Sequence, residues 1–227
     1  MISIVREGGV VDFPAFLGER VYMHEFRMGA GLPEHLKRWQ HTVDQMLIGV
    51  DTDGPIYLMI DQKTVTASST HRRPGLHVDG YWVPAGSGWD GGGKPAWNGV
   101  SAHGGGSHRA RPEPPSHGGG SHRSLRAFEW PGHPEYPTWR FDARDRPEAI
   151  ILASDISASR GLVGEFDGPI KVGGDVSHLD LSHLEQVLLQ AGRVYQGNVS
   201  FIHESLPVPV DCQRTLVRLN VPGHRVH

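Results

Sequence analysis

The sequence predicts a mainly β protein, either a β-sandwich or a jelly-roll type barrel, with a few helices packed outside. The chain of 227 residues contains 30 Gly and 17 Pro, which is typical of many turns and long loops. Roughly eight to ten short apolar or alternating runs indicate strands, against two segments with helical spacing. We expect one domain over residues 1–227, because all-β folds of this size commonly stay undivided.

The N-terminal part supplies strands and the first predicted helix. Residues 1–30 hold β-branched and aromatic runs between Gly and Pro, so we expect short strands at the edge of a sheet. After Pro33, apolar residues recur at helical spacing and predict a helix over residues 34–48. The run 55–70 is interrupted by polar residues at 61–63 and is expected to form two strands joined by a turn.

Residues 84–137 break this pattern and predict a long Gly-rich loop insertion. Twelve of the 30 glycines lie between Gly86 and Gly120, and no apolar periodicity is present. The motif HGGGSHR occurs at 103–109 and again at 117–123. A basic segment of this kind is expected either to close over an active site or bind an anionic partner, or to be a surface insertion with incidental metal binding. Both interpretations stay open.

The C-terminal part predicts three further strands and a second helix. Residues 147–155 form a strongly apolar strand, and residues 181–192 have the spacing of a short helix that ends at Gly192. Residues 197–205 and 213–222 are expected to be the last two strands.

Composition and charge narrow the function classes. Cys212 is the only cysteine, which excludes an internal disulfide framework or a multi-thiolate metal site and favours a reducing, cytoplasmic location. No apolar run approaches the length of a membrane span or a signal peptide, so we expect no membrane association. A net charge of −3 does not favour nucleic acid, although a local patch could still bind it. The 15 His direct attention to metal binding.

Three residues have the types and spacing of a metal site. His77 and Asp79 are two residues apart, so in an extended chain their side chains lie on one face. His203, in the strand-like run VSFIHES, is the candidate third ligand. Two histidines and one carboxylate suit Fe(II) and leave coordination positions open.

The order of these residues, followed by Arg214, resembles the HxD…H…R signature of the Fe(II)/2-oxoglutarate-dependent dioxygenases. The resemblance covers roughly residues 57–79 and 196–221. It implies a double-stranded β-helix fold, His77, Asp79 and His203 as iron ligands, and Arg214 as the residue that binds the co-substrate 2-oxoglutarate. Arginine suits this role because its planar fork pairs with a carboxylate through two hydrogen bonds.

The same resemblance implies oxidation of a small-molecule or side-chain substrate, most simply hydroxylation of an unactivated carbon with release of succinate and CO2. Family members that halogenate lack the carboxylate that Asp79 provides, so its presence favours hydroxylation. Arg218 lies on the same strand face as Arg214 and, together with Arg73, is a candidate for binding substrate. For both, a surface arginine is the alternative.

Two other function classes remain open at this stage. A cupin-type metal enzyme that does not use 2-oxoglutarate would keep the metal ligands without needing Arg214. A non-catalytic jelly-roll module with a binding or structural role, for instance a virus-associated protein, would need neither. The substrate and the oligomeric state do not follow from the sequence.

Overall fold

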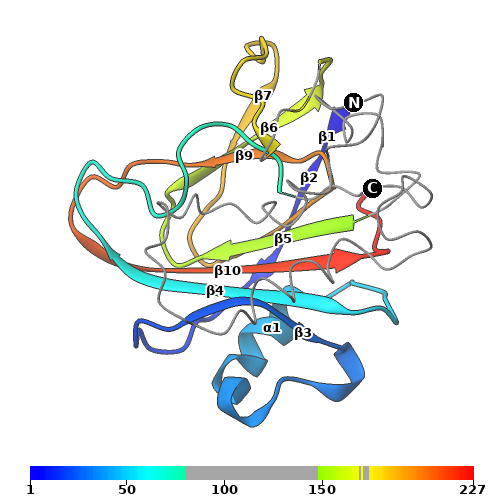
Figure 1. The fold of residues 1–227 in the computed structure, drawn as a ribbon, viewed down its shortest axis with the longest axis vertical. Coiled ribbons are helices and arrows are strands. Elements are labelled where there is room, and N and C mark those ends of the chain that lie inside the picture. The colour runs from blue at the N-terminus through cyan, green and yellow to red at the C-terminus, as the bar shows by residue number, and fades with distance from the viewer. Residues whose placement is uncertain (80–147, 169, 171–173) are drawn as a thin grey trace, which may run out of the picture.

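The computed structural model describes residues 1–79, 148–168, 170 and 174–227. Over these residues the fold is mainly β, with ten strands, one short α-helix and two 3-10 helices (Figure 1). The strands form two antiparallel sheets, so the mainly β prediction is confirmed. The helices of this part of the chain are all too short to cross a lipid bilayer.

The larger sheet has six strands, all antiparallel to their neighbours. Their order across the sheet is β2 (Val5–Val10), β8 (Arg193–Gly197), β5 (Glu148–Ser154), β10 (Cys212–Pro222), β4 (Ile56–Val65) and β3 (Arg20–Phe26). The long strand β10 lies between β4 and β5 and pairs with both. Its central position places its side chains deep inside the molecule.

The smaller sheet has four strands: β1 (Ile2–Ser3), β6 (Ser159–Glu165), β7 (Glu185–Leu188) and β9 (Ile202–Ser205). Strand β6 pairs with each of the other three. Figure 1 shows this sheet on one side of the larger sheet and helix α1 (Gln40–Met46) on the other.

The two faces of the larger sheet differ in chemistry. One face packs apolar residues of alternate strand positions, such as Val217 and Leu219, against the 3-10 helix η2 (Glu34–Trp39) and α1, where Trp39 is fully buried. Burial of each such side chain stabilises the fold by about 1.5–3 kcal/mol. The opposite face carries Arg214 and Arg218, which alternate with those apolar residues along β10 and point toward the smaller sheet.

Two sequence predictions for the N-terminal part can be compared directly with these elements, and a third falls outside them. The helix expected over 34–48 is present as η2 followed by α1, while η1 (Met28–Ala30) was not anticipated. The turn expected within 55–70 is wrong, because β4 runs unbroken from Ile56 to Val65 and pairs with β10 across residues 61–63. Residues 84–137, with both HGGGSHR repeats, lie outside the described residues.

The helix predicted over residues 181–192 is also wrong. A turn is closed by the hydrogen bond from Leu184 N to Leu181 O, and β7 then pairs with β6. The apolar spacing that indicated a helix instead places Leu181 and Leu184 in the turn and Leu189 directly after β7, and all three are buried. Pairing with β6 therefore outweighs the local helical preference.

Candidate metal centre

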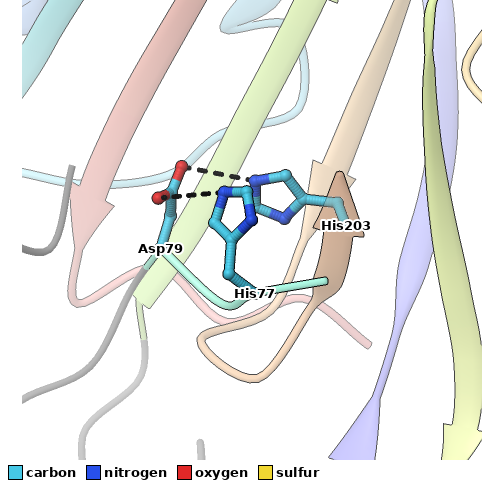
Figure 2. Close-up of side chains that lie close together, drawn as sticks. All are labelled: His77, Asp79 and His203. Carbon is cyan, nitrogen blue, oxygen red and sulfur yellow. Dashed lines mark ion pairs between the residues drawn. The ribbon is translucent and has the colours of Figure 1, made fainter. Parts of the chain in front are cut away.

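His77, Asp79 and His203 converge between the two sheets (Figure 2). All three are buried, and one potential ligand atom from each lies within 4.8 Å of the others. Asp79 Oδ1 lies 3.9 Å from His77 Nε2, and Asp79 Oδ2 lies 3.3 Å from His203 Nε2. The structure thus brings together the three ligands that the sequence predicted, from positions far apart in the chain.

Backbone pairing fixes the two histidines side by side. His77 N donates to His203 O at 3.0 Å, and His203 N donates to His77 O at 2.9 Å, so the segment around His77 adds to the edge of β9. On the other side, Val78 N donates to Gly174 O and His77 bridges to Asp175. The segment is therefore extended, and His77 and Asp79 share a face as the sequence predicted.

Both imidazoles are oriented through their Nδ1 atoms. His77 Nδ1–H donates to the carbonyl oxygen of Gly75 at 2.7 Å, and His203 Nδ1–H donates to that of Phe201 at 3.1 Å. A carbonyl can only accept, so in the neutral rings Nε2 carries the lone pair. Both Nε2 atoms face Asp79, and hydrogen bonds of this kind from the other ring nitrogen are usual for metal-binding histidines.

The electrostatics of the cluster favour deprotonated ligands. Burial, followed by the neighbouring His203 ring, lowers the pKa of His77 to about 3, which leaves its Nε2 free of a proton at neutral pH. Burial opposes ionisation of Asp79, but the Arg218 guanidinium, together with the contacts to His203 and His77, outweighs burial and holds the pKa of Asp79 well below its usual range. Asp79 is thus a carboxylate and His77 is neutral, as metal ligation requires.

The two carboxylate oxygens of Asp79 lie in different environments. Arg218 Nη1 donates to Oδ2, while Oδ1 is buried and has no hydrogen-bond partner among the described residues. A buried carboxylate oxygen without a partner is costly. A cation held by Oδ1 and the two Nε2 atoms would remove that cost, so the three residues fit a divalent metal.

The ligands line a cavity of about 390 Å³, including the solvent space at its mouth. Its described wall combines apolar, hydroxyl and charged side chains: Met59, Arg72, Leu152, Ser159, Glu204, Ser205, Leu216 and Arg218. A coordination position that faces this space would be accessible to a ligand.

Four arginines bear on the cavity. The sequence predicted that Arg214 binds the co-substrate and that Arg73 and Arg218 bind substrate, and Arg72 is the neighbour of Arg73. Arg218 contacts Asp79 and lines the cavity. Arg72 lines the cavity, whereas its neighbour Arg73, the predicted substrate residue, is not among the lining residues. Arg214 is fully buried and does not line the cavity directly.

The Arg214 guanidinium is enclosed by hydrogen-bond acceptors. Its Nε donates to Ser154 Oγ at 3.1 Å, Nη1 to Ala158 O at 3.1 Å, and Nη2 to Ser159 Oγ at 2.9 Å. Of these partners, Ser159 lines the metal cavity. Arg214 is therefore connected to the cavity through its hydrogen bond to the Ser159 hydroxyl. The sequence did not indicate a role for Ser159.

Gly174 is a second residue that the sequence analysis missed. It adopts a φ of +76°, and a Cβ at this position would lie 2.0 Å from the carbonyl oxygen of Val78, between the two ligands His77 and Asp79. The backbone approach requires glycine here. Its only sequence signal is a Gly-Gly-Asp run, which is typical of any turn.

Replacing Gly174 by alanine is therefore expected to displace Val78 and weaken divalent-metal binding by about 10-fold or more. Calorimetric titration with Co(II) would measure the change. Gly49→Ala is the matched control, because Gly49 has a similar φ of +79° but open space around its Cβ position. Equal metal affinities in the two variants would show that the contact with Val78 does not position the ligands.

Comparison of the chain with protein-family models, with curated proteins and with solved structures gave no match. The fold and the metal centre are therefore interpreted from the residues of this chain alone.

Proposed function

We propose that this protein is an Fe(II)-dependent oxygenase that uses 2-oxoglutarate as co-substrate. The observation that carries the proposal is the buried cluster of two imidazoles and one carboxylate at the wall of a cavity. This set of donors is typical of non-haem iron enzymes, in which the remaining positions bind oxygen and substrate. Thiolate ligands, which would favour zinc, are absent from the cluster.

The sheet topology supports the finer proposal of a double-stranded β-helix. Strand β4 belongs to the larger sheet, His77 then forms a bridge to His203 on β9 of the smaller sheet, and β5 belongs to the larger sheet again. The chain then forms β6 and β7 in the smaller sheet, β8 in the larger, β9 in the smaller and β10 in the larger. This alternation between two sheets is expected of a jelly roll.

A bound Fe(II) would couple the decarboxylation of 2-oxoglutarate to insertion of one oxygen atom of O2 into a substrate C–H bond, giving succinate, CO2 and an alcohol. The chain's own residues provide the surroundings for this reaction. His77 and His203 each offer one imidazole nitrogen, and Asp79 supplies one negative charge. Leu152 and Leu216 supply an apolar wall that limits water around the metal.

The co-substrate residue proposed here is Arg214, acting together with Ser159. Ser159 Oγ accepts the hydrogen bond from Arg214 Nη2, so its own O–H does not point at the guanidinium. The O–H can therefore donate to a carboxylate in the cavity. A small movement of Ser159 would also let the guanidinium contact that carboxylate itself. Charge-assisted hydrogen bonds of this type contribute about 1.5–3 kcal/mol each.

Anaerobic addition of Fe(II) and then 2-oxoglutarate is expected to produce the weak visible charge-transfer band of an iron-chelated keto acid. Arg214→Lys keeps the charge but loses the planar fork, and Ser159→Ala removes the hydroxyl, so each should raise the Kd for 2-oxoglutarate by about 10- to 100-fold. Arg6→Ala, at an exposed position on β2, is the control.

A specific observation favours a second function, a metal-dependent oxygenase or isomerase that does not use 2-oxoglutarate. Arg214 does not line the cavity directly, and three of its guanidinium nitrogens already have partners within the protein. If the charge-transfer band were absent from folded, iron-loaded protein, this second function would replace the first. Absence of stoichiometric iron would instead leave a non-catalytic module.

A further inference from the structure

A positively charged part of the metal cavity has no role in the chemistry proposed above. Two arginines, Arg72 and Arg218, are present among the described lining residues. Arg218 is engaged by Asp79. The lining acid, Glu204, is engaged by Arg160, whose Nε donates to Glu204 Oε1 at 2.7 Å. Arg72 differs from Arg218 because its carboxylate partner, Asp61, is shared with a second arginine.

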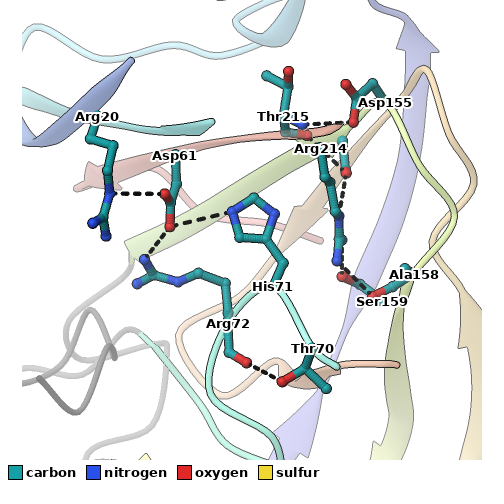
Figure 3. Close-up of polar contacts among 11 residues, drawn as sticks. Arg20, Asp61, Thr70, His71, Arg72, Asp155, Ala158, Ser159, Arg214 and Thr215 are labelled. Carbon is teal, nitrogen blue, oxygen red and sulfur yellow. Dashed lines mark hydrogen bonds and ion pairs between the residues drawn. The ribbon is translucent and has the colours of Figure 1, made fainter. Parts of the chain in front are cut away.

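Arg72 is held in place by a buried carboxylate (Figure 3). Its Nη1 donates to Asp61 Oδ2 at 2.8 Å, and its own carbonyl accepts a hydrogen bond from the Thr70 hydroxyl. Asp61 lies on β4 and is almost fully buried, while the Arg72 side chain is 15% exposed. The contact is well placed to keep the guanidinium at one point of the cavity wall, because Asp61 lies on β4, which is paired with β10 on one side and β3 on the other.

The negative charge of Asp61 is shared between two arginines. Arg20 Nε lies 3.2 Å from Asp61 Oδ1, on the side of the carboxylate away from Arg72. His71 Nε2 lies 3.4 Å from Oδ2, but burial lowers the pKa of His71, so this ring stays neutral near pH 7. One carboxylate therefore faces two positive charges, the mostly buried Arg72 and the largely exposed Arg20, and the group as a whole carries a net positive charge.

Arg72 also has more hydrogen-bond donors than acceptors among the residues that the structure describes. A guanidinium has five N–H groups, and Nη1 is the atom of Arg72 that has an acceptor among the described side chains. Its other edge offers a fork that matches a carboxylate, sulfate or phosphate group. A donor edge and uncompensated charge at the wall of a cavity are the features of an anion-binding residue.

We propose that Arg72 binds an anionic group of the substrate, and that Asp61 is the positioning residue that holds Arg72 in the cavity. The identification of the bound molecule as the substrate rests on the proposed function. The substrate would then carry a carboxylate, sulfate or phosphate group that is bound apart from the metal. Because Arg214 and Ser159 are assigned to 2-oxoglutarate, the two anions would occupy different positions.

Sulfate is a suitable probe, because it matches the guanidinium fork and is a poor ligand for iron. We would titrate sulfate by calorimetry into the full-length protein loaded anaerobically with Fe(II) and 2-oxoglutarate, at constant ionic strength. The wild-type protein is expected to bind sulfate while the charge-transfer band persists. Arg72→Gln should weaken sulfate binding by at least about 10-fold, and Arg72→Lys should weaken it less.

Two further variants separate this role from general effects. Asp61→Asn should weaken sulfate binding because Arg72 loses its position, and thermal unfolding would verify that each variant folds. Arg73→Gln changes the adjacent arginine and should leave sulfate affinity unchanged. Loss of binding in Arg73→Gln but not in Arg72→Gln would overturn the proposal, as would no sulfate binding in any protein.

The last possible outcome is that sulfate competes with 2-oxoglutarate for the same position. If sulfate displaced 2-oxoglutarate and erased the band, Arg72 would belong to the co-substrate position and the proposal would be wrong. Failure of the proposed function is recognised separately, because the band would then be absent before sulfate is added. Sulfate binding by the metal-loaded protein and its loss in Arg72→Gln would still be measurable in that case.

Discussion

Replacing His203 by alanine is expected to lower the affinity for Fe(II) by more than about 100-fold and to abolish turnover. His203 supplies one of the three ligand atoms of the cluster, and its removal leaves only His77 and Asp79. Changes to residues that merely orient metal ligands typically cost 10- to 100-fold in affinity, so loss of a ligand should cost more. Anaerobic calorimetric titration with Fe(II) would measure the effect.

His41→Ala is the matched control for this experiment. His41 lies on α1 with a side chain that is 72% exposed, and its contact is with Asp12 at the surface. The control should bind one equivalent of iron as the wild-type protein does. Tight stoichiometric iron binding by the His203→Ala protein would show that the iron site lies elsewhere in the protein.

Replacing Asp79 by alanine is expected to destabilise even the metal-free protein, by about 3–5 kcal/mol. Asp79 is the described ion-pair partner of Arg218, and both side chains are almost fully buried. Removing one member of a buried ion pair leaves the other charge without compensation, and this is the range of cost usually measured. Urea unfolding of the metal-free protein, followed by circular dichroism, would give the change in the free energy of unfolding.

A double variant tests the reason for this loss. Arg218→Met removes the charge but keeps a long apolar side chain, so Asp79→Ala combined with Arg218→Met should recover much of the stability that Asp79→Ala alone loses. Additive losses from the two single changes would mean that the ion pair is not the cause. Metal binding should stay absent in the double variant, because Asp79 is still missing.

The proximity of the candidate metal ligands was predictable in part, because their spacing carries physical information. An i, i+2 pair shares a face in extended chain, so His77 and Asp79 could be assigned together. The partnership with His203 followed from a family resemblance, since nothing local relates two segments so far apart. The structure supplies that relation through the two backbone hydrogen bonds between His77 and His203.

Other parts of the site depend on packing that no local pattern encodes. The sequence prediction named Arg73, whereas Arg72 lines the cavity, because neighbouring arginines on an irregular segment cannot be distinguished without knowing which carboxylate lies nearby. Asp61 was assigned to a turn because a charged residue interrupted an apolar run. An acid in the middle of an apolar strand was in fact the signal of a buried ion-pair network.

The pairing of His77 with His203 also bears on how this chain tolerates change. Residues 80–147 follow directly after the ligand Asp79, yet the ligands are held by hydrogen bonds to β9 and to Gly174, both of which lie beyond that segment in the chain. Changes in the length of that segment are therefore expected to leave the distances between His77, Asp79 and His203 unchanged.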